Sequence, residues 1–386
     1  MLMAVGVPGK KKLSKDFCPL KIRNDLNLFL QKMNSGLAPG RFKFCENGGQ
    51  IPTKGKYGQM TTTFAIKTAV QCGLWKNWKN DQKEGAIKFI KSFQDKSGYF
   101  VDPWLKKSCK INLKDIIKHF FFIRSLKESK RIHNYNNKSN LRAETRQSSA
   151  TLLMVNKYPK YPLPLEIYDE KSLDYFFKSL NWDDPWHANS QVSHQIMMLS
   201  INNRITPKKK YDDLIKKILI FFDSIYEKRT GTWVKNKETD KQFKLNGAMK
   251  FYSGLQWINW LKKKPNKALI DFALSIPIKF DGCNFTNSLF TLYHASKGLK
   301  SYKRDEIISR AIECLNHSSL HKINGSGYSF HYKSCQMGYY TQRTSKGGNQ
   351  ADMHGTGMFS LGITLALELM GEFAPKGSEY WKYHKT

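Results

Sequence analysis

The sequence predicts an all-α fold: an α/α toroid of about six outer–inner helix pairs in a single domain spanning residues 1–386. A Gly-x-aromatic turn recurs along the chain, and an amphipathic helical pattern precedes most of these turns. A second helical segment, rich in small and apolar residues, follows them. The chain is 40% hydrophobic, which is enough for one large core.

The recurring turn is clearest at two places. Residues 94–100 read Q-x-x-x-G-x-F, and residues 227–233 read E-x-x-x-G-x-W. Weaker relatives lie at 40–42, 282–285 and 325–330, and the segment 181–186 fills the corresponding place between them. Glycine permits a positive-φ reversal, and the aromatic ring fills the gap between helix layers. The turns are therefore predicted to join each outer helix to an inner one.

Outer helices are predicted where apolar residues recur at three- and four-residue spacing, most clearly at 86–93, 214–222, 269–276 and 307–315. Such a helix can bury its apolar stripe only against an inner partner. The inner helices are predicted to begin near Thr61, Arg146, Asn189, Leu245, Asn287 and Asp352. Small residues on them, such as Ser193, Gly247 and Gly357, allow close packing. An insertion at about 105–141 lengthens one connection.

The formal net charge is +33, from 64 Lys and Arg against 31 Asp and Glu. This charge favours an anionic partner, such as a diphosphate, an acidic glycan or an acidic lipid surface. Lys, Asn and Ile are abundant together, however, so the codon bias of an AT-rich genome is the favoured explanation of the charge. No nucleic-acid-binding motif is present. The oligomeric state is left open.

The seven cysteines show no paired spacing, which predicts a reducing compartment rather than a disulfide framework. The N-terminal apolar stretch is too short for a signal peptide, and no run approaches the ~20 apolar residues of a membrane helix. We therefore expect a cytoplasmic protein, with peripheral association at a membrane surface as the alternative.

The turns at 94–100 and 227–233 resemble the Q-x-x-x-G-x-W repeat of the terpenoid cyclase and protein prenyltransferase superfamily. That resemblance implies an α/α toroid with a central, aromatic-lined cavity. It further implies an enzyme, a transferase or cyclase, that acts in the cavity on a small-molecule or lipid-like substrate. The expected substrate is isoprenoid-like, or apolar with an anionic tag.

Residues 279–283 and 350–356 are similar to the D-G-C and D-x-x-H-T segments of protein prenyltransferase catalytic subunits, although the second reads D-M-H-G-T here. The resemblance implies that Asp281, Cys283 and His354 bind Zn²⁺ and that Lys279 contacts a diphosphate. One oxygen, one thiolate and one imidazole would leave a fourth zinc position open for a substrate thiol. We expect these three residues to converge, because Cys283 and His354 lie at the starts of neighbouring inner helices. The alternative is a small buried cysteine and a hydrogen-bonded histidine.

A second candidate is the run from Asp183 to His194, which faintly resembles the D-x-D-D segment of class II terpene cyclases. Asp183 is then the acid that protonates an alkene, which requires a carboxyl held neutral in a dry site. Capping of the following helix by Asp183 and Asp184 is the favoured alternative. His194 is either a general base or a hydrogen-bonded polar residue.

A third candidate is Arg146, a cation at the start of an inner helix that could hold a carboxylate or phosphate. The alternative is a surface pair of Glu144 with Arg142 or Arg146. Trp186 and Tyr293 are candidate cavity-lining residues.

Two other functions stay open. One is a carbohydrate-active lyase or epimerase of an acidic glycan, because α/α toroids also host such enzymes. His194 or His354 would then serve with Tyr293 or Tyr340 as base and acid. The other is a non-catalytic toroid that serves as a binding scaffold.

Overall fold

A computed structural model of the chain describes residues 11–47, 58–102, 126–258, 260, 266–278, 281–299, 301–339 and 342–385. Within these ranges the fold is all-α, as predicted, and the strands form only two short hairpins. The helices are α1 (Pro19–Asn34), α2 (Gln59–Gln71), α3 (Asn80–Ser92), α6 (Leu126–Met154), α7 (Glu170–Ser179), α8 (Pro185–Ile205), α9 (Lys209–Ser224), α10 (Lys241–Leu255), α11 (Lys267–Ser275), α12 (Gly282–Ala295), α13 (Arg304–Ser318) and α14 (Met353–Met370). The antiparallel strand pairs are β1 (Tyr226–Glu227) with β2 (Thr232–Trp233), and β3 (Gly338–Tyr339) with β4 (Gln342–Arg343).

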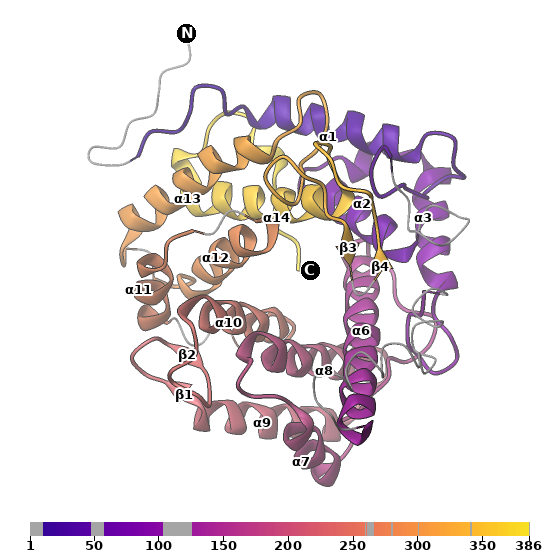
Figure 1. Cartoon of the computed structure of the whole chain (residues 1–386), viewed down its shortest axis with the longest axis vertical. Coiled ribbons are helices and arrows are strands. Elements are labelled where there is room, and N and C mark those ends of the chain that lie inside the picture. Colours follow the sequence, from indigo (N-terminus) through magenta and orange to yellow (C-terminus); the bar gives the residue numbers. More distant parts are fainter. Residues whose placement is uncertain are drawn as a thin grey trace.

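Six inner helices contact one another in a closed cycle. α2 packs on α6, α6 on α8, α8 on α10, α10 on α12 and α12 on α14, and α14 returns to α2 (Figure 1). These helices are buried on almost every side. All thirteen residues of α2 are buried, as are sixteen of the eighteen in α14. A helix with neighbours all round has no solvent face to keep polar, which explains why their sequences lack a strong amphipathic period.

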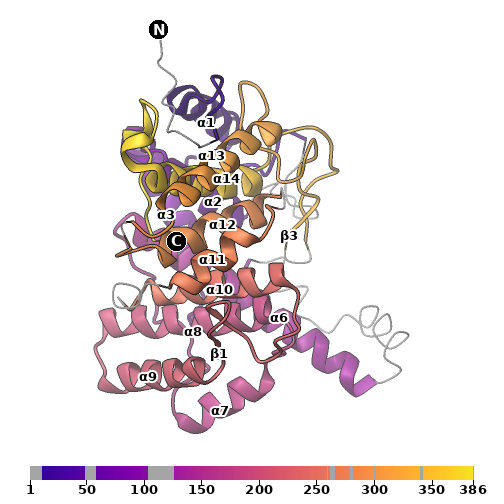
Figure 2. The same ribbon diagram turned by 90° about the vertical axis from the view of Figure 1, so that its left-hand side faces the viewer.

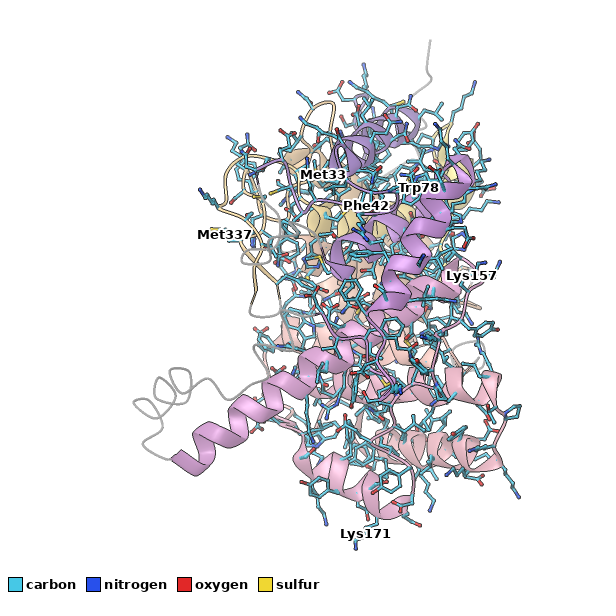
Figure 3. The ribbon with its side chains drawn as sticks, turned by 90° about the vertical axis from the view of Figure 1, so that its right-hand side faces the viewer. Met33, Phe42, Trp78, Lys157, Lys171 and Met337 are labelled. Atoms are coloured by element: carbon cyan, nitrogen blue, oxygen red, sulfur yellow. The ribbon has the colours of Figure 1, made fainter. Side chains whose placement is uncertain are left out.

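The remaining helices lie outside this cycle and bury one stripe each. α1 and α3 pack on α2, α9 on α8, α11 on α12, and α13 on α14 and α12, while α7 packs on α9 (Figures 1 and 2). In α7, for example, Leu173, Phe176 and Phe177 are buried. Phe42, which follows α1, stacks on Trp78 before α3, with ring centroids 5.4 Å apart (Figure 3). The alternation of outer and inner helices agrees with the sequence pattern.

Small residues allow the close approach of α8 and α10. A Cβ atom on Gly247 would lie 2.9 Å from the carbonyl oxygen of Pro185, and one on Gly254 would lie 2.9 Å from Cα of Ser193. Any larger residue at either glycine would push the two helices apart. The predicted role of Ser193 and Gly247 in inner-helix packing is therefore confirmed.

The two clearest repeat turns share one geometry. In each, the backbone on either side of a positive-φ glycine pairs in antiparallel fashion: around Gly98, with φ of 88°, and around Gly231, with φ of 67°. The first residue of each motif fixes the turn through its side chain. Gln94 Nε2 donates to the carbonyl oxygens of Gly98 (3.1 Å) and Tyr161 (2.8 Å). Glu227 forms a buried ion pair with Lys244 of α10 at 3.1 Å.

Three expectations about element positions need correction. Most inner helices begin several residues earlier than predicted; α8, for example, begins at Pro185 and α12 at Gly282. Gly282 is therefore the first residue of a helix rather than a turn glycine, because Asp281 caps that helix. Residues 126–141 of the predicted insertion belong to α6, whose N-terminal part projects from the ring (Figure 2). Residues 103–125 lie outside the described ranges.

None of the described helices has the length and hydrophobicity needed to cross a bilayer.

Replacing the turn glycine tests the structural role of the repeat. A Cβ atom at Gly98 would lie 2.1 Å from the carbonyl oxygen of Pro162, in addition to the strain of a positive φ. Gly298 provides a matched control, because its φ is +86° with no atom near an added Cβ. We expect Gly98→Ala to lower the free energy of unfolding by about 3 kcal/mol or more, and Gly298→Ala by about 1 kcal/mol. Urea denaturation followed by circular dichroism measures both, and equal losses would contradict the close packing of this turn.

Candidate functional site

Three cationic side chains from three inner helices lie close enough within the ring for their charges to interact. Lys67 belongs to α2, Arg146 to α6 and Lys250 to α10. Burial first, and then the charges of Arg146 and Lys250, hold the pKa of Lys67 well below its usual value. Burial and Arg146 lower the pKa of Lys250 to about 8. The three residues thus repel one another in a poorly hydrated place.

The positions along the helices explain how these side chains meet. Lys67 and Lys250 lie more than two turns into α2 and α10. Helical side chains lean toward the N-terminus of their own helix, so both amines reach back toward the N-terminal ends of the inner helices. Gln147, next to Arg146, accepts a hydrogen bond from Lys67 Nζ. Lys250 and Gln147 remain half-buried, although the helices around them are otherwise closed to solvent.

Glu144 of α6 lies beside these cations but does not neutralise them. Glu144 of α6 is buried, and burial together with the charge of Asp102 raises its pKa to about 8. Gln59 Nε2 donates to its carboxyl group at 2.6 Å. Glu144 therefore carries a proton at neutral pH and adds no negative charge beside Lys67, Arg146 and Lys250.

Two neutral imidazoles border the cluster. The pKa of His194 is held well below its usual value by burial and then by the charges of Arg146 and Lys250. The pKa of His354 is lowered to about 3 by burial and then by Lys250, His331 and Lys67. Both are predicted site residues, and both lie close enough to the cationic cluster for its charges to control their protonation.

The surroundings of His354 select one tautomer. Its Nδ1 is hydrogen-bonded to Gln336 Oε1, and because an amide oxygen only accepts, Nδ1 carries the proton. Nε2 therefore presents a lone pair. The ring stacks on Phe330 with centroids 4.7 Å apart and contacts Phe64 and Tyr339 at 4.8 and 5.0 Å. This aromatic enclosure removes water from the imidazole and explains its low pKa.

The three residues predicted as zinc ligands do not form a metal site. Within the described ranges, no group of three or more His, Cys, Asp or Glu side chains is arranged to hold a metal ion. Asp281 Oδ1 instead accepts from the backbone N–H groups of Cys283 (3.0 Å) and Asn284 (2.9 Å), which caps α12. Phe330 lies between the two motifs, since its carbonyl oxygen accepts from Gly282 N and its ring stacks on His354. Burial raises the pKa of Cys283 to about 12, so it is a thiol.

Asp183 lacks the burial that the predicted role of catalytic acid requires. Asp183 is exposed in the turn before α8, whereas an acid that protonates an alkene must be buried. Its neighbour Asp184 caps α8, because its Oδ1 accepts from His187 N at 3.0 Å. The favoured alternative, capping, is confirmed for Asp184.

The other predicted residues divide between the two ends of the ring. Trp186 lies in the first turn of α8, half-buried, with its ring edge toward Phe243. Tyr293 lies near the C-terminal end of α12, where its hydroxyl donates to Glu368 at 2.7 Å, so it is remote from the cluster. Lys279 and Tyr340 lie outside the described residues.

The alternative, a pair of Glu144 with Arg142 or Arg146 at the surface, needs correction, because all three side chains are buried. Arg142 Nη2 donates to Glu166 Oε2 at 2.6 Å, and its Nη1 donates to Gln191 of α8 at 2.9 Å. Arg142 thereby holds the segment before α7 against α6 and α8. Arg146, one helical turn later, is buried, and its charge acts on Lys67 and Lys250. Its expected role of holding a carboxylate or phosphate stays a prediction.

Sequence inspection missed Lys67, Lys250 and Gln336. A lysine inside a segment of small and apolar residues was the available signal for Lys67, in T-T-T-F-A-I-K-T-A-V, and for Lys250, in N-G-A-M-K-F-Y. Charged residues are seldom buried without a partner or a purpose, so such lysines are candidates in any inner helix. Gln336 gave no signal, because it belongs to a segment with no helical or repeat pattern.

The chain was compared with protein-family models, with curated proteins and with solved structures, and none of them matches. The interpretation of the site therefore depends on its own residues. Buried cations beside neutral histidines can bind an anionic group and can accept a proton from it.

The protonation of Glu144 makes stability depend on pH. Its pKa in the folded protein is about 8, above the ordinary 4.5, so the folded state binds the extra proton between these values. The contribution of Glu144 to the free energy of unfolding is at its full value below pH 4.5 and is lost as the pH rises toward 8. We expect Glu144→Gln to be more stable than wild type at pH 9 by about 1 kcal/mol or more, with little difference at pH 5. Urea denaturation at both pH values, with the exposed Glu372→Gln as control, tests this.

Proposed function

We propose that the ring is an α/α toroid whose interior binds an anionic substrate, and that the protein is an enzyme acting on that substrate. The closed cycle of inner helices supports the toroid. The cluster of Lys67, Arg146 and Lys250 is the single observation that carries the assignment of an anionic substrate. Folding places three mutually repelling cations together at a cost in free energy, and a bound anion offsets that cost.

Each cation contributes differently to anion recognition. Arg146 offers a planar guanidinium suited to two oxygens of a carboxylate or phosphate. Lys67 and Lys250 act as point charges, and both are depressed in pKa by burial and mutual repulsion. An anion bound between them raises both pKa values, so binding and protonation are coupled.

His354 is the residue we assign as the proton acceptor. Gln336 holds the proton on Nδ1, which leaves Nε2 as the base. In the empty site its pKa of about 3 makes it a weak base, and two of the causes are the charges of Lys250 and Lys67. A bound anion offsets both charges and brings the imidazole toward the basicity that catalysis near neutral pH needs.

A carboxylate-bearing polar substrate, such as an acidic glycan, fits this arrangement best. Cations that neutralise a carboxylate make the adjacent C–H bond more acidic, and a neutral histidine removes the proton, as lyases and epimerases of uronates require. Polar side chains also lie nearby: Gln147 is hydrogen-bonded to Lys67, Ser190 is hydrogen-bonded to His194, and Asn246 lies one helical turn before Lys250. This favours the carbohydrate-active alternative among the functions expected from the sequence.

The second candidate is an apolar substrate with a phosphate or diphosphate tag, as in the terpenoid cyclase and prenyltransferase superfamily. The observation that favours it is the enclosure of His354 by Phe64, Phe330 and Tyr339. Such rings can pack against an isoprenoid chain while the cations bind its tag.

Ligand binding by the purified full-length protein tests the function. Titration calorimetry with an oligouronate, the matching neutral oligosaccharide and farnesyl diphosphate compares the candidates. We expect the oligouronate to bind and the neutral sugar not to bind. Lys250→Gln should weaken binding about tenfold or more, because it removes a partly buried charge from the site. Lys241→Gln, at the exposed start of the same helix, is the matched control and should change affinity less than about twofold.

Turnover distinguishes an enzyme from a scaffold. His354→Gln should abolish formation of an unsaturated or epimerised uronate while leaving binding of the oligouronate within a few-fold of wild type. Preferential binding of farnesyl diphosphate would favour the second candidate. If neither anion binds, or if Lys250→Gln and Lys241→Gln behave alike, the assignment is wrong.

The depressed pKa of Lys250 predicts how anion binding depends on pH. Below about 8 its amine is charged in the free protein and attracts the anion; above that value the amine is neutral and affinity falls. A bound anion raises the pKa, so binding near pH 8–9 should take up protons. Titrations in buffers of different ionisation enthalpy measure this uptake, and Lys250→Gln should reduce it. Affinity that is constant from pH 6 to 10 would contradict the role of Lys250.

A further inference from the structure

Two cysteines far apart in the sequence form a thiol pair beneath the surface. Cys45 follows α1 and Cys335 precedes β3, and both are fully buried free thiols. Their side chains are hydrogen-bonded to each other. Neither sequence spacing nor the proposed function accounts for this pairing.

Backbone hydrogen bonds hold both cysteines in place. Cys45 pairs in antiparallel fashion with Asp352, and the carbonyl oxygen of the preceding residue, Phe44, accepts from Met353 N at 2.8 Å. On the other side, Cys335 N donates to Gly348 O at 2.9 Å. The two sulfur atoms are therefore brought together by segments that are fixed on both sides, at the N-terminal end of α14.

The two sulfur atoms have unlike environments. Cys335 is hydrogen-bonded by Cys45, by Ser345 Oγ at 3.1 Å and by Gln350, and these contacts lower its pKa although burial opposes this. The pKa of Cys45 is raised by its bond to Cys335, by burial and by the nearby charge of Asp352. Cys335 is thus the more acidic thiol and the better nucleophile, and Cys45 beside it is placed as the resolving partner.

We propose that Cys45 and Cys335 are an oxidisable dithiol that hydrogen peroxide converts into a reversible disulfide. The Cys335 sulfur attacks one peroxide oxygen, the O–O bond breaks, and sulfenic acid forms with release of water once a proton is taken up. The Cys45 sulfur then displaces the sulfenic hydroxyl, which leaves as water. In balance, two thiols and one peroxide give one disulfide and two waters.

The position of the pair allows a small oxidant to reach it. The segment that covers Cys335 includes Lys346, Gly348 and Asn349, which are exposed. Met337, two residues after Cys335, is 57% exposed on the outward-facing loop (Figure 3). A local opening of this surface segment uncovers the sulfur without unfolding the ring.

Formation of the disulfide would affect the candidate site through Gln336. Cys335 is followed by Gln336, whose side chain holds His354 and whose backbone N–H donates to Asp352 Oδ2 at 3.1 Å. A disulfide requires the two sulfurs to be about 2.05 Å apart, so its formation must move this segment. The dithiol itself does not depend on the proposed function.

Peptide mapping of the wild-type, reduced full chain tests the dithiol. After treatment with hydrogen peroxide, we expect the thiol count to fall by two, and non-reducing digestion should yield a peptide crosslinked between Cys45 and Cys335. Dithiothreitol should reverse both changes. Because the bond closes a very long loop of chain, the oxidised protein should melt roughly 5 °C higher or more.

Variants separate the pair from the other cysteines. Cys45→Ser should prevent the crosslink and leave Cys335 as a sulfenic acid that dimedone traps. Cys72→Ser, which removes a buried cysteine whose thiol donates to the carbonyl oxygen of Thr68 at 3.0 Å, should leave the crosslink intact. The proposal is overturned if exposed Cys18 is oxidised while Cys45 and Cys335 stay reduced, or if either residue crosslinks to a different cysteine. Mapping of the wild type decides the question even if Cys45→Ser does not fold.

Discussion

The return of α14 to α2 is the contact on which the rest of the structure depends. A row of inner helices that did not close would leave an apolar face exposed at each end, whereas closure gives every inner helix two buried neighbours. The contact is tight, since a Cβ on Gly357 would lie 2.5 Å from the ring of Phe64. It also brings His354 of α14 within 4.8 Å of that ring and near Lys67 of α2. The contact that closes the core therefore also brings residues of the candidate site together.

Closure of the ring is electrostatically unfavourable for three of its cationic side chains. Lys67, Arg146 and Lys250 lose hydration where the inner helices meet, and each raises the electrostatic energy of the others. The core around them is large enough to bear this cost, because nearly every residue of α2, α10 and α14 is otherwise well buried. Local conflict inside a consistent fold is the usual mark of a site that serves something other than stability.

At the starts of the inner helices, the presence of an aspartate did not identify a catalytic or metal-binding residue. Asp281, Asp184 and Asp352 all resemble site residues in the sequence, yet each carboxylate accepts backbone N–H groups at the first turn of an inner helix. A repeat architecture needs such a cap in every repeat, so aspartates recur there for structural reasons. The cap still contributes to function indirectly: Asp352 places His354 at the second position of α14.

The sequence by itself determined the helical class, the alternation of outer and inner helices and the two clearest turns, because these depend on periodicity and on glycine at fixed offsets. It also identified Arg146, His194 and His354 as candidates. Only the tertiary structure decided which of its polar residues meet. Lys67 and Lys250 lie on inner helices that are not neighbours in the cycle, and their charges interact only across the folded ring. The partners of a buried charge depend on distances across the ring, which no local pattern encodes.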